Sequence, residues 1–398
     1  MKRILVFSHA LELGGAEKVL LGLLEAIDKN QYCVDLFLMR HEGELLPYIP
    51  EGVNLLPEIP AYSCLAVPMA RVLKKGQFAV AFGRARGKAA ARRRVKELGL
   101  PGDNDVSLQY SHKYTLFAMP RLGGTEYDLA ISFLTPHYFV ANRVKAKRKI
   151  AWIHTDYSTV AVDREEQLQM WSAYDRIISI SEQVSRSFCK TFPELSDKLI
   201  LIPHFLPVQS MRIQAEAFSA EAEMPKDGAL RLLSIGRFCT AKNFDNVPDI
   251  CRRIRESGWN VKWYLIGFGG DEALIRSRIE EAGMGESVVI LGRKGNPYPY
   301  IRACDLYVQP SRYEGKCVSV LEAQILGKPV VIADYPTAQS QLRDGVDGVI
   351  VPQDNEGCAR GIAKLLEDPE KMAALCKSCE LNDYSGAGES GKLYELME

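Results

Sequence analysis

Short, continuously apolar runs that alternate with longer amphipathic segments constrain the fold of this chain more than any other feature. In the first half these runs lie at residues 3–8, 33–39, 129–133, 150–153, 177–180 and 199–202. Apolar runs of this length are typical of strands that helices cover on both faces of a parallel sheet. A Gly14-Gly15 turn and a helical pattern from Ala16 to Ile27 follow the first run, which predicts a βαβ opening.

A second alternation begins after a polar stretch at 209–228. Its runs lie at 230–236, 261–266, 288–291, 306–309, 330–333 and 348–351. We therefore predict two doubly wound α/β domains, at 1–205 and 206–375, followed by a helical tail at 376–398 that could pack back on the first domain. The expected ligand site lies in the cleft between the two domains, at the carboxyl ends of strands.

Residues 57–122 interrupt the first alternation and are expected to form a helical insertion. Ten Lys or Arg residues and one acidic residue, Glu97, lie between Arg71 and Leu98. This segment carries an apolar stripe of Phe78, Phe82, Ala85 and Ala89. Such a helix could lie on an anionic membrane surface, and a solvated insertion helix, weakened by its glycines, is the alternative.

Composition narrows the class of protein. The 50 basic and 50 acidic residues cancel, which argues against a dedicated nucleic-acid-binding protein. No apolar run approaches the ~20 residues that span a bilayer, and the ten cysteines are scattered, as is typical of reduced thiols. We expect a cytoplasmic protein, with residues 71–98 as a candidate contact to the cytoplasmic face of the membrane.

Two carboxylates eight positions apart, Glu314 and Glu322, provide the sharpest functional signal. Glu314 follows a predicted strand at 305–309, and Glu322 lies within a helix predicted from Val318 to Leu326. A carboxylate at such a strand end would repel a bare phosphate but can accept hydrogen bonds from hydroxyl groups attached to one. A nucleotide sugar has hydroxyl groups on both sides of its diphosphate. Two carboxylates on a solvated helix are the alternative.

Basic residues and glycines occupy matching strand ends. Arg237 and Lys242 follow the first strand of the second domain, where a planar guanidinium and a mobile ammonium would suit a diphosphate. A solvated loop is the alternative. Gly14-Gly15 occupies the first strand-to-helix turn of the other domain, where glycine permits close approach of phosphate or sugar.

Taken in order, these motifs resemble those of the retaining glycosyltransferases of family 4, which have the GT-B fold. The motifs are Gly14-Gly15-Ala16-Glu17-Lys18, Gly236-Arg237, Lys242-Asn243, Glu314 with Glu322, and Gly327-Lys328-Pro329-Val330. The resemblance implies two Rossmann-like domains facing across a cleft. It also implies a hexosyltransferase-type enzyme that moves a sugar from a nucleoside-diphosphate donor to a saccharide or lipid-linked acceptor, with retention and without a metal or other cofactor, in surface polysaccharide or glycolipid synthesis.

The resemblance assigns roles by position. Glu314 would contact the transferred sugar, and His154 would be the strand-end histidine that contacts the donor sugar or diphosphate; these two are the predicted catalytic residues. A satisfied core or capping histidine is the alternative for His154. The predicted donor-binding residues are Gly15, Arg237, Lys242, Gly292, Arg293, Gly315, Lys316, Cys317 and Glu322, with Glu322 on the ribose and Gly292 and Arg293 near the nucleobase.

Some positions depart from the family pattern. Lys316-Cys317 replaces a common Phe-Gly, so the donor sugar cannot be carried over from relatives. His204 stands where Asn is more usual, and no role is assigned to that position. Asp103-Asn104-Asp105 has the form of a metal-binding motif of a different glycosyltransferase fold, but it lies in an insertion turn and no metal is expected there. A nucleotide-sugar epimerase on the same fold and a non-catalytic scaffold at the membrane surface remain the rival functions.

Overall fold

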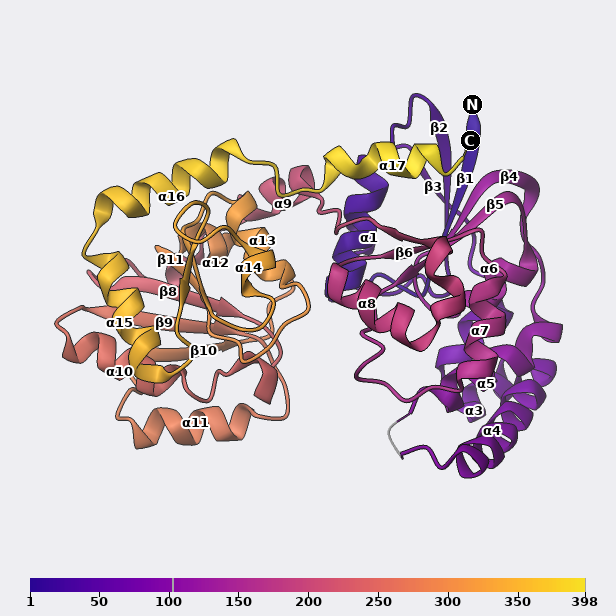
Figure 1. The fold of residues 1–398 in the computed structure, drawn as a ribbon, viewed down its shortest axis with the longest axis horizontal. Coiled ribbons are helices and arrows are strands. Elements are labelled where there is room, and N and C mark those ends of the chain that lie inside the picture. Colours follow the sequence, from indigo (N-terminus) through magenta and orange to yellow (C-terminus); the bar gives the residue numbers. More distant parts are fainter. Residues whose placement is uncertain (102–103, 398) are drawn as a thin grey trace. The chain divides into compact units, whose positions relative to one another are not determined.

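A computed structural model describes residues 1–101 and 104–397 and divides the chain into two compact units (Figure 1). The first unit comprises Met1 to Leu206 together with the C-terminal segment from Gly386, and the second comprises Pro207 to Ser385. Asp103 of the Asp-x-Asp motif lies outside the described residues. Within the described ranges no helix is both long and apolar enough to cross a membrane.

The first unit is built on a parallel seven-stranded sheet with the order β3-β2-β1-β4-β5-β6-β7. Its strands are β1 (Lys2–Ser8), β2 (Tyr32–Leu38), β3 (Val53–Leu55), β4 (Leu122–Ser132), β5 (Val144–Ile153), β6 (Arg176–Ser179) and β7 (Leu199–Leu201). Its helices outside the insertion are α1 (Gly15–Ala26), α6 (His137–Arg143), α7 (Arg164–Ser172), α8 (Glu182–Thr191) and α17 (Ser390–Glu395). The inner strand β1 is buried along Ile4 to Phe7 because helices cover both faces, as the apolar run predicts.

The second unit is built on a parallel six-stranded sheet with the order β10-β9-β8-β11-β12-β13. Its strands are β8 (Leu230–Ile235), β9 (Val261–Ile266), β10 (Val288–Gly292), β11 (Leu306–Gln309), β12 (Val330–Ala333) and β13 (Val349–Val351). Its helices are α9 (Val208–Ala215), α10 (Val247–Glu256), α11 (Glu272–Glu281), α12 (Tyr298–Ala303), α13 (Val318–Ile325), α14 (Ala338–Gln341), α15 (Asn355–Leu366) and α16 (Pro369–Leu381). The prediction of two doubly wound parallel α/β sheets is confirmed.

The strand orders define where each sheet can hold a ligand. In the first sheet the chain order reverses between β1 and β4, and in the second it reverses between β8 and β11. The loops that leave the carboxyl ends of these neighbouring strands diverge to opposite faces of the sheet, which leaves a crevice. The Gly14-Gly15 turn follows β1, while Arg237 and Glu314 follow β8 and β11.

The insertion between β3 and β4 is helical, with α2 (Pro60–Ser63), α3 (Met69–Lys74), α4 (Phe78–Leu98) and α5 (Val106–Thr115). Helix α4 packs on α5 through Gly83 and Gly87, where an added Cβ would come within 2.6 Å of the carbonyl oxygens of Tyr114 and Tyr110. The glycines that would weaken an isolated helix therefore permit close helix packing.

The chain from 376 onward is divided differently from the prediction. Helix α16 continues to Leu381 within the second unit, because Leu375 and Cys379 are buried on it and no break occurs at 376. Only the segment from Gly386 belongs to the first unit. There Tyr394 of α17 stacks on Tyr32 with 4.7 Å between ring centroids, and its hydroxyl accepts a hydrogen bond of 3.0 Å from the Asp28 amide.

Candidate functional site

Four loops of the second unit meet at the carboxyl edge of its sheet. The Gly267 amide donates to the Gly292 carbonyl at 3.0 Å, which joins the loops after β9 and β10. The Arg312 amide donates to the Ala241 carbonyl at 2.8 Å, which joins the loops after β11 and β8. Gly267 has a φ of 158°, and a Cβ there would lie 1.9 Å from the Gly236 carbonyl oxygen. Glycine at 267 is therefore required for the loops to close on one another. The Gly267-Phe268-Gly269 sequence directly after a predicted strand is a signal for a loop of the site. The predicted site residues did not include it.

The two motifs of the second unit meet in a largely buried ion pair. Lys242 Nζ lies 2.5 Å from Glu314 Oε1, and only 18% of the lysine side chain and 11% of the glutamate side chain are exposed. Burial lowers the pKa of Lys242, but the neighbouring Cys317 and Glu314 raise it more, so the pKa lies above its usual value. Lys242 is therefore a fixed positive charge at neutral pH.

A chain of hydrogen bonds holds the Glu314 carboxylate from the interior. The Tyr307 hydroxyl donates to Gln309 Oε1 at 2.9 Å, and Gln309 Nε2 donates to Ser311 Oγ at 2.9 Å. Ser311 Oγ then donates to Glu314 Oε1 at 2.7 Å, while Thr337 Oγ1 donates to the Glu314 carbonyl at 2.8 Å. The sequence signal for these hydrogen bonds is a pair of polar residues, Gln309 and Ser311, at the end of an apolar strand. The prediction from motifs did not include either residue.

Residues 315–317 border the ion pair. Apart from its two chain neighbours, no described residue has an atom within 4 Å of the position that a Cβ on Gly315 would occupy. Lys316 is half-buried, which lowers its pKa. Cys317 caps α13, and its thiol lies 3.8 Å from Lys242 Nζ; burial raises the pKa of that thiol and keeps it neutral.

Glu322 is deeper than its predicted role suggests. It is 1% exposed, and the Tyr298 hydroxyl donates to its Oε1 at 3.1 Å. The structure thus buries Glu322 on α13, in contact with Tyr298 of α12. Contact with a ribose through this carboxylate requires a rearrangement of the wall that Tyr298 forms.

The two predicted arginines lie on the neighbouring loops and are exposed. Among the described residues Arg237 forms no ion pair within 4.0 Å, so its guanidinium is open to a ligand. Arg293 follows Gly292 and lies with its guanidinium carbon 5.2 Å from the centre of the Phe268 ring. Gly292 itself has a φ of 72°, in the region that favours glycine.

Gly15 and His154 belong to the first unit. Gly14 caps α1, and a Cβ there would lie 2.1 Å from Glu17 Oε2, so the flexible end of the Glu17 side chain would have to move. Gly15 is the first helical residue and is exposed. His154 follows β5, and its ring centre lies 4.7 Å from that of Phe133. Burial, together with His204 and His137, lowers the pKa of His154 to about 3, so the imidazole is neutral.

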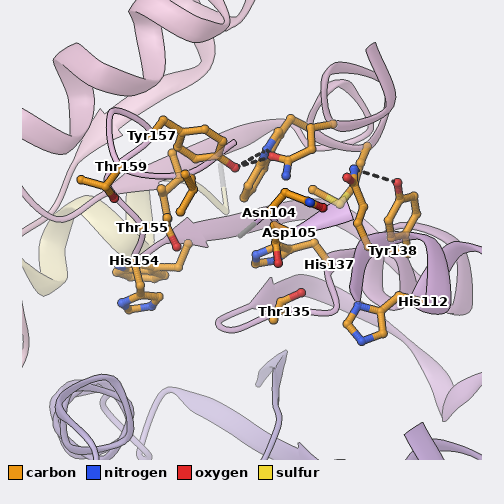
Figure 2. Close-up of a pocket in the computed structure, with 17 residues that line it drawn as sticks. Asn104, Asp105, His112, Thr135, His137, Tyr138, His154, Thr155, Tyr157 and Thr159 are labelled. Atoms are coloured by element: carbon orange, nitrogen blue, oxygen red, sulfur yellow. Dashed lines mark hydrogen bonds between the residues drawn. The ribbon is translucent and has the colours of Figure 1, made fainter. Parts of the chain in front are cut away.

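His154 also lines a cavity of about 290 Å³ within the first unit (Figure 2). The walls come from α5 and the residues before it, the loops after β4 and β5, α6 and α7. The Tyr157 hydroxyl donates to Gln167 Oε1 at 2.6 Å, and Gln109 Nε2 donates to the Tyr138 hydroxyl at 3.3 Å. Of these lining residues the sequence analysis selected His154 alone, because the cavity is assembled from segments far apart in the chain.

Comparison with known families finds a match for the second unit. Residues 217–379, within the second unit, match the family model described as Glycosyl transferases group 1. The amylovoran biosynthesis glycosyltransferase AmsK of Erwinia amylovora is 22% identical over 263 residues, which cover 58% of this chain and 64% of that protein. The lipopolysaccharide core biosynthesis glycosyltransferase LpsE of Rhizobium meliloti is 28% identical over 159 residues, 40% of this chain and 45% of that protein. The chain thus spans less than two thirds of the length of either relative.

Solved structures share the whole fold. HepE of Anabaena, in complex with UDP and glucose, superimposes with a TM-score of 0.67 at 16% identity and 99% coverage of both chains. Sucrose-phosphate synthase of Thermosynechococcus elongatus gives a TM-score of 0.63 at 17% identity, covering 99% of this chain and 98% of the other. The fold is therefore GT-B, as predicted. Residues 217–379 match the group 1 glycosyltransferase model, which supports the predicted family resemblance for that part of the chain.

Proposed function

We propose that this protein transfers a hexose-type sugar from a nucleoside-diphosphate donor to an acceptor hydroxyl, with retention of anomeric configuration. The Lys242–Glu314 pair carries the proposal, because it puts a buried cation and a hydrogen-bond acceptor at the switch point of a group 1 glycosyltransferase unit. The complexes of HepE with UDP and with UDP-glucose support this class of donor. The relatives AmsK and LpsE support a role in surface polysaccharide or lipopolysaccharide assembly.

The residues of the second unit suit the charges that form in this reaction. The bond between the anomeric carbon and the diphosphate oxygen breaks, the acceptor oxygen bonds to the same carbon, and the acceptor proton passes to the leaving phosphate. Lys242 has three N–H donors, so it can bind Glu314 and a phosphate oxygen together. With the exposed Arg237 it would stabilise the growing negative charge, an effect worth several kcal/mol when donors are preorganised (roughly 3–4 per donor).

The remaining predicted residues complete the donor site in this proposal. Glu314, fixed by Ser311, accepts a hydrogen bond from the transferred sugar, and His154 contacts that sugar as a neutral imidazole. Glu322 accepts a hydrogen bond from the ribose once the wall that Tyr298 forms has rearranged. Gly292 and Arg293 border the base, and Gly15, Gly315, Lys316 and Cys317 border the diphosphate and sugar. Lys242 and Arg237 supply the positive charge, so the proposal requires no metal ion.

The basic insertion supports a peripheral position on the cytoplasmic face of a membrane. Phe78 and Phe82 are 67% and 58% exposed, and Ala85 and Ala89 of the same stripe are also exposed. Lys88, Arg92 and Lys96 on α4 are exposed beside them. An apolar stripe flanked by cations is the pattern of an interfacial helix, and an acceptor carried on a lipid would be presented there.

Product analysis with a panel of nucleotide sugars and a lipid-linked saccharide tests the proposed function. Transfer with retained anomeric configuration in the presence of EDTA is the expected result. Donor interconversion without transfer would identify an epimerase instead. Absence of donor binding and turnover would leave the non-catalytic scaffold.

A further inference from the structure

The cavity of the first unit contains an unusual group of buried polar atoms. Gln109 Oε1, Trp152 Nε1 and His154 Nε2 each lack a hydrogen-bond partner among the described residues, and all three residues line the cavity. A buried polar atom without a partner costs about 1–3 kcal/mol. Three such atoms around one cavity, two of them ring nitrogens and one an amide oxygen, indicate a ligand with hydroxyl groups that both donate and accept.

The lining of the cavity selects the chemistry of that ligand. Aromatic side chains of Tyr138, Trp152, Tyr157 and Trp171 contribute to the walls. Among the described lining residues there is no lysine or arginine, and Asp105 is the acidic one. This set repels phosphate and carboxylate groups but suits a neutral ring with apolar C–H faces and hydroxyl edges. A volume of about 290 Å³ is at the lower end for ligand sites and suits a single ring.

The insertion builds one wall of this cavity. Gln109 lies on α5, which α4 approaches through Gly83 and Gly87. Asp163 joins the insertion to the opposite wall, because it accepts hydrogen bonds from Arg94 Nε at 2.7 Å and the Tyr110 hydroxyl at 2.9 Å while it caps α7. Helix α7 carries Gln167 and Trp171 on that wall. The hydrogen bonds from Arg94 and Tyr110 to Asp163 thus fix the position of α5, and with it Gln109, relative to α7.

We propose that this cavity binds one neutral glycosyl residue of the acceptor and that Gln109 of the insertion selects its hydroxyl pattern. The inference rests on the proposed glycosyltransferase function, since it names the class of acceptor. Gln109 is a specificity residue in this account. His154 belongs to both this wall and the proposed donor site.

Intrinsic tryptophan fluorescence tests the proposal, because two of the four tryptophans, Trp152 and Trp171, line the cavity. The full chain is titrated with neutral methyl glycosides of different hydroxyl configuration and with the corresponding sugar 6-phosphates. At least one neutral glycoside is expected to bind saturably, and its phosphate more weakly. Gln109→Leu is expected to weaken that binding about tenfold, the loss for one unmet buried hydrogen bond.

The matched control is Gln169→Leu, on the exposed side of α7 and outside the cavity lining. It is expected to bind the glycoside like the wild type. If Gln109→Leu does not fold, Gln109→Asn replaces it, with the same expected loss of affinity. Failure of every neutral glycoside to bind, tighter binding of the phosphates, or equal affinity of the Gln109 variant and the control would overturn the proposal.

A UDP titration separates this proposal from the donor site. If the wild-type chain binds a glycoside but not UDP, the proposed donor is contradicted and the cavity assignment stands. UDP binding without glycoside binding would contradict the cavity assignment and leave the donor proposal standing.

Discussion

Lys242 and Glu314 are separated by 72 positions in the sequence, yet their side chains form a 2.5 Å ion pair at the reversal point of the second sheet. Each residue comes from a loop that leaves one of two neighbouring strands, β8 and β11. The pair is held on one side by the Ser311 hydrogen bond and bordered on the other by the open space at Gly315. It is therefore a preorganised charge at an accessible edge.

Glu314→Gln should reduce turnover by about 10²–10³-fold, because the amide keeps the size and the acceptor oxygen but loses the negative charge that complements the reacting sugar. The variant should also unfold at a lower temperature, because Lys242 loses its buried anionic partner, so transfer is measured at a temperature where the variant is folded. Steady-state transfer with a nucleotide sugar measures the effect, and Glu280→Gln on the exposed face of α11 is the control. Turnover close to that of the wild type would remove Glu314 from the chemistry.

The buried histidines should make the protein sensitive to acid. Burial, and secondarily His112, lowers the pKa of His137 to about 3 from an ordinary 6.5. The unfolded chain therefore binds a proton below pH 6.5 that the folded chain refuses, so the stability present above pH 6.5 is lost as the pH falls. For His137 alone the slope approaches about 1.4 kcal/mol per pH unit.

Chemical denaturation at several pH values between 7 and 5 measures that slope. His137→Asn should flatten the pH dependence by up to this amount, since asparagine does not titrate and can still hydrogen-bond Ser132. An unchanged slope in the His137 variant would contradict a neutral, buried imidazole.

Gly87→Ala should destabilise the first unit even though alanine favours helices. The new Cβ would lie 2.6 Å from the Tyr110 carbonyl oxygen, and overpacking costs about 1–3 kcal/mol, against a helix-propensity gain of about 1. Gly124→Ala is the control, because no described residue other than its chain neighbours has an atom within 4 Å of the new Cβ. Equal denaturation midpoints for the two variants would show that α4 and α5 are less closely packed.

Phe78→Ser combined with Phe82→Ser should abolish sedimentation with anionic vesicles and leave folding unchanged, because both rings are exposed. Binding by the wild type should decrease as salt rises, since the cations of α4 contribute about 1 kcal/mol each near an anionic surface. Cosedimentation with anionic and with neutral vesicles measures both effects. Indifference of the wild type to anionic lipid would end the membrane proposal.

The sequence predicted those features that follow from local pattern and parallel-sheet topology. Glu314 and Lys242 could be brought together in advance because both follow strands whose carboxyl ends share one edge. The glycines of α4 were read as a weakness, since their packing partner α5 is set by tertiary structure. The burial of Glu322 against Tyr298 and the cavity around Gln109 depend on contacts between distant segments, which periodicity does not encode.

Isothermal titration of UDP into the full chain tests the central claim most directly. The wild type should bind UDP, and Lys242→Met should weaken binding at least about tenfold because it removes the buried ammonium. Lys262 lies on β9, and its ammonium pairs with Asp227. The Lys262→Met control should therefore bind UDP as the wild type does. Equal UDP affinity in the wild type and the Lys242 variant, or no UDP binding by the wild type, would contradict the account.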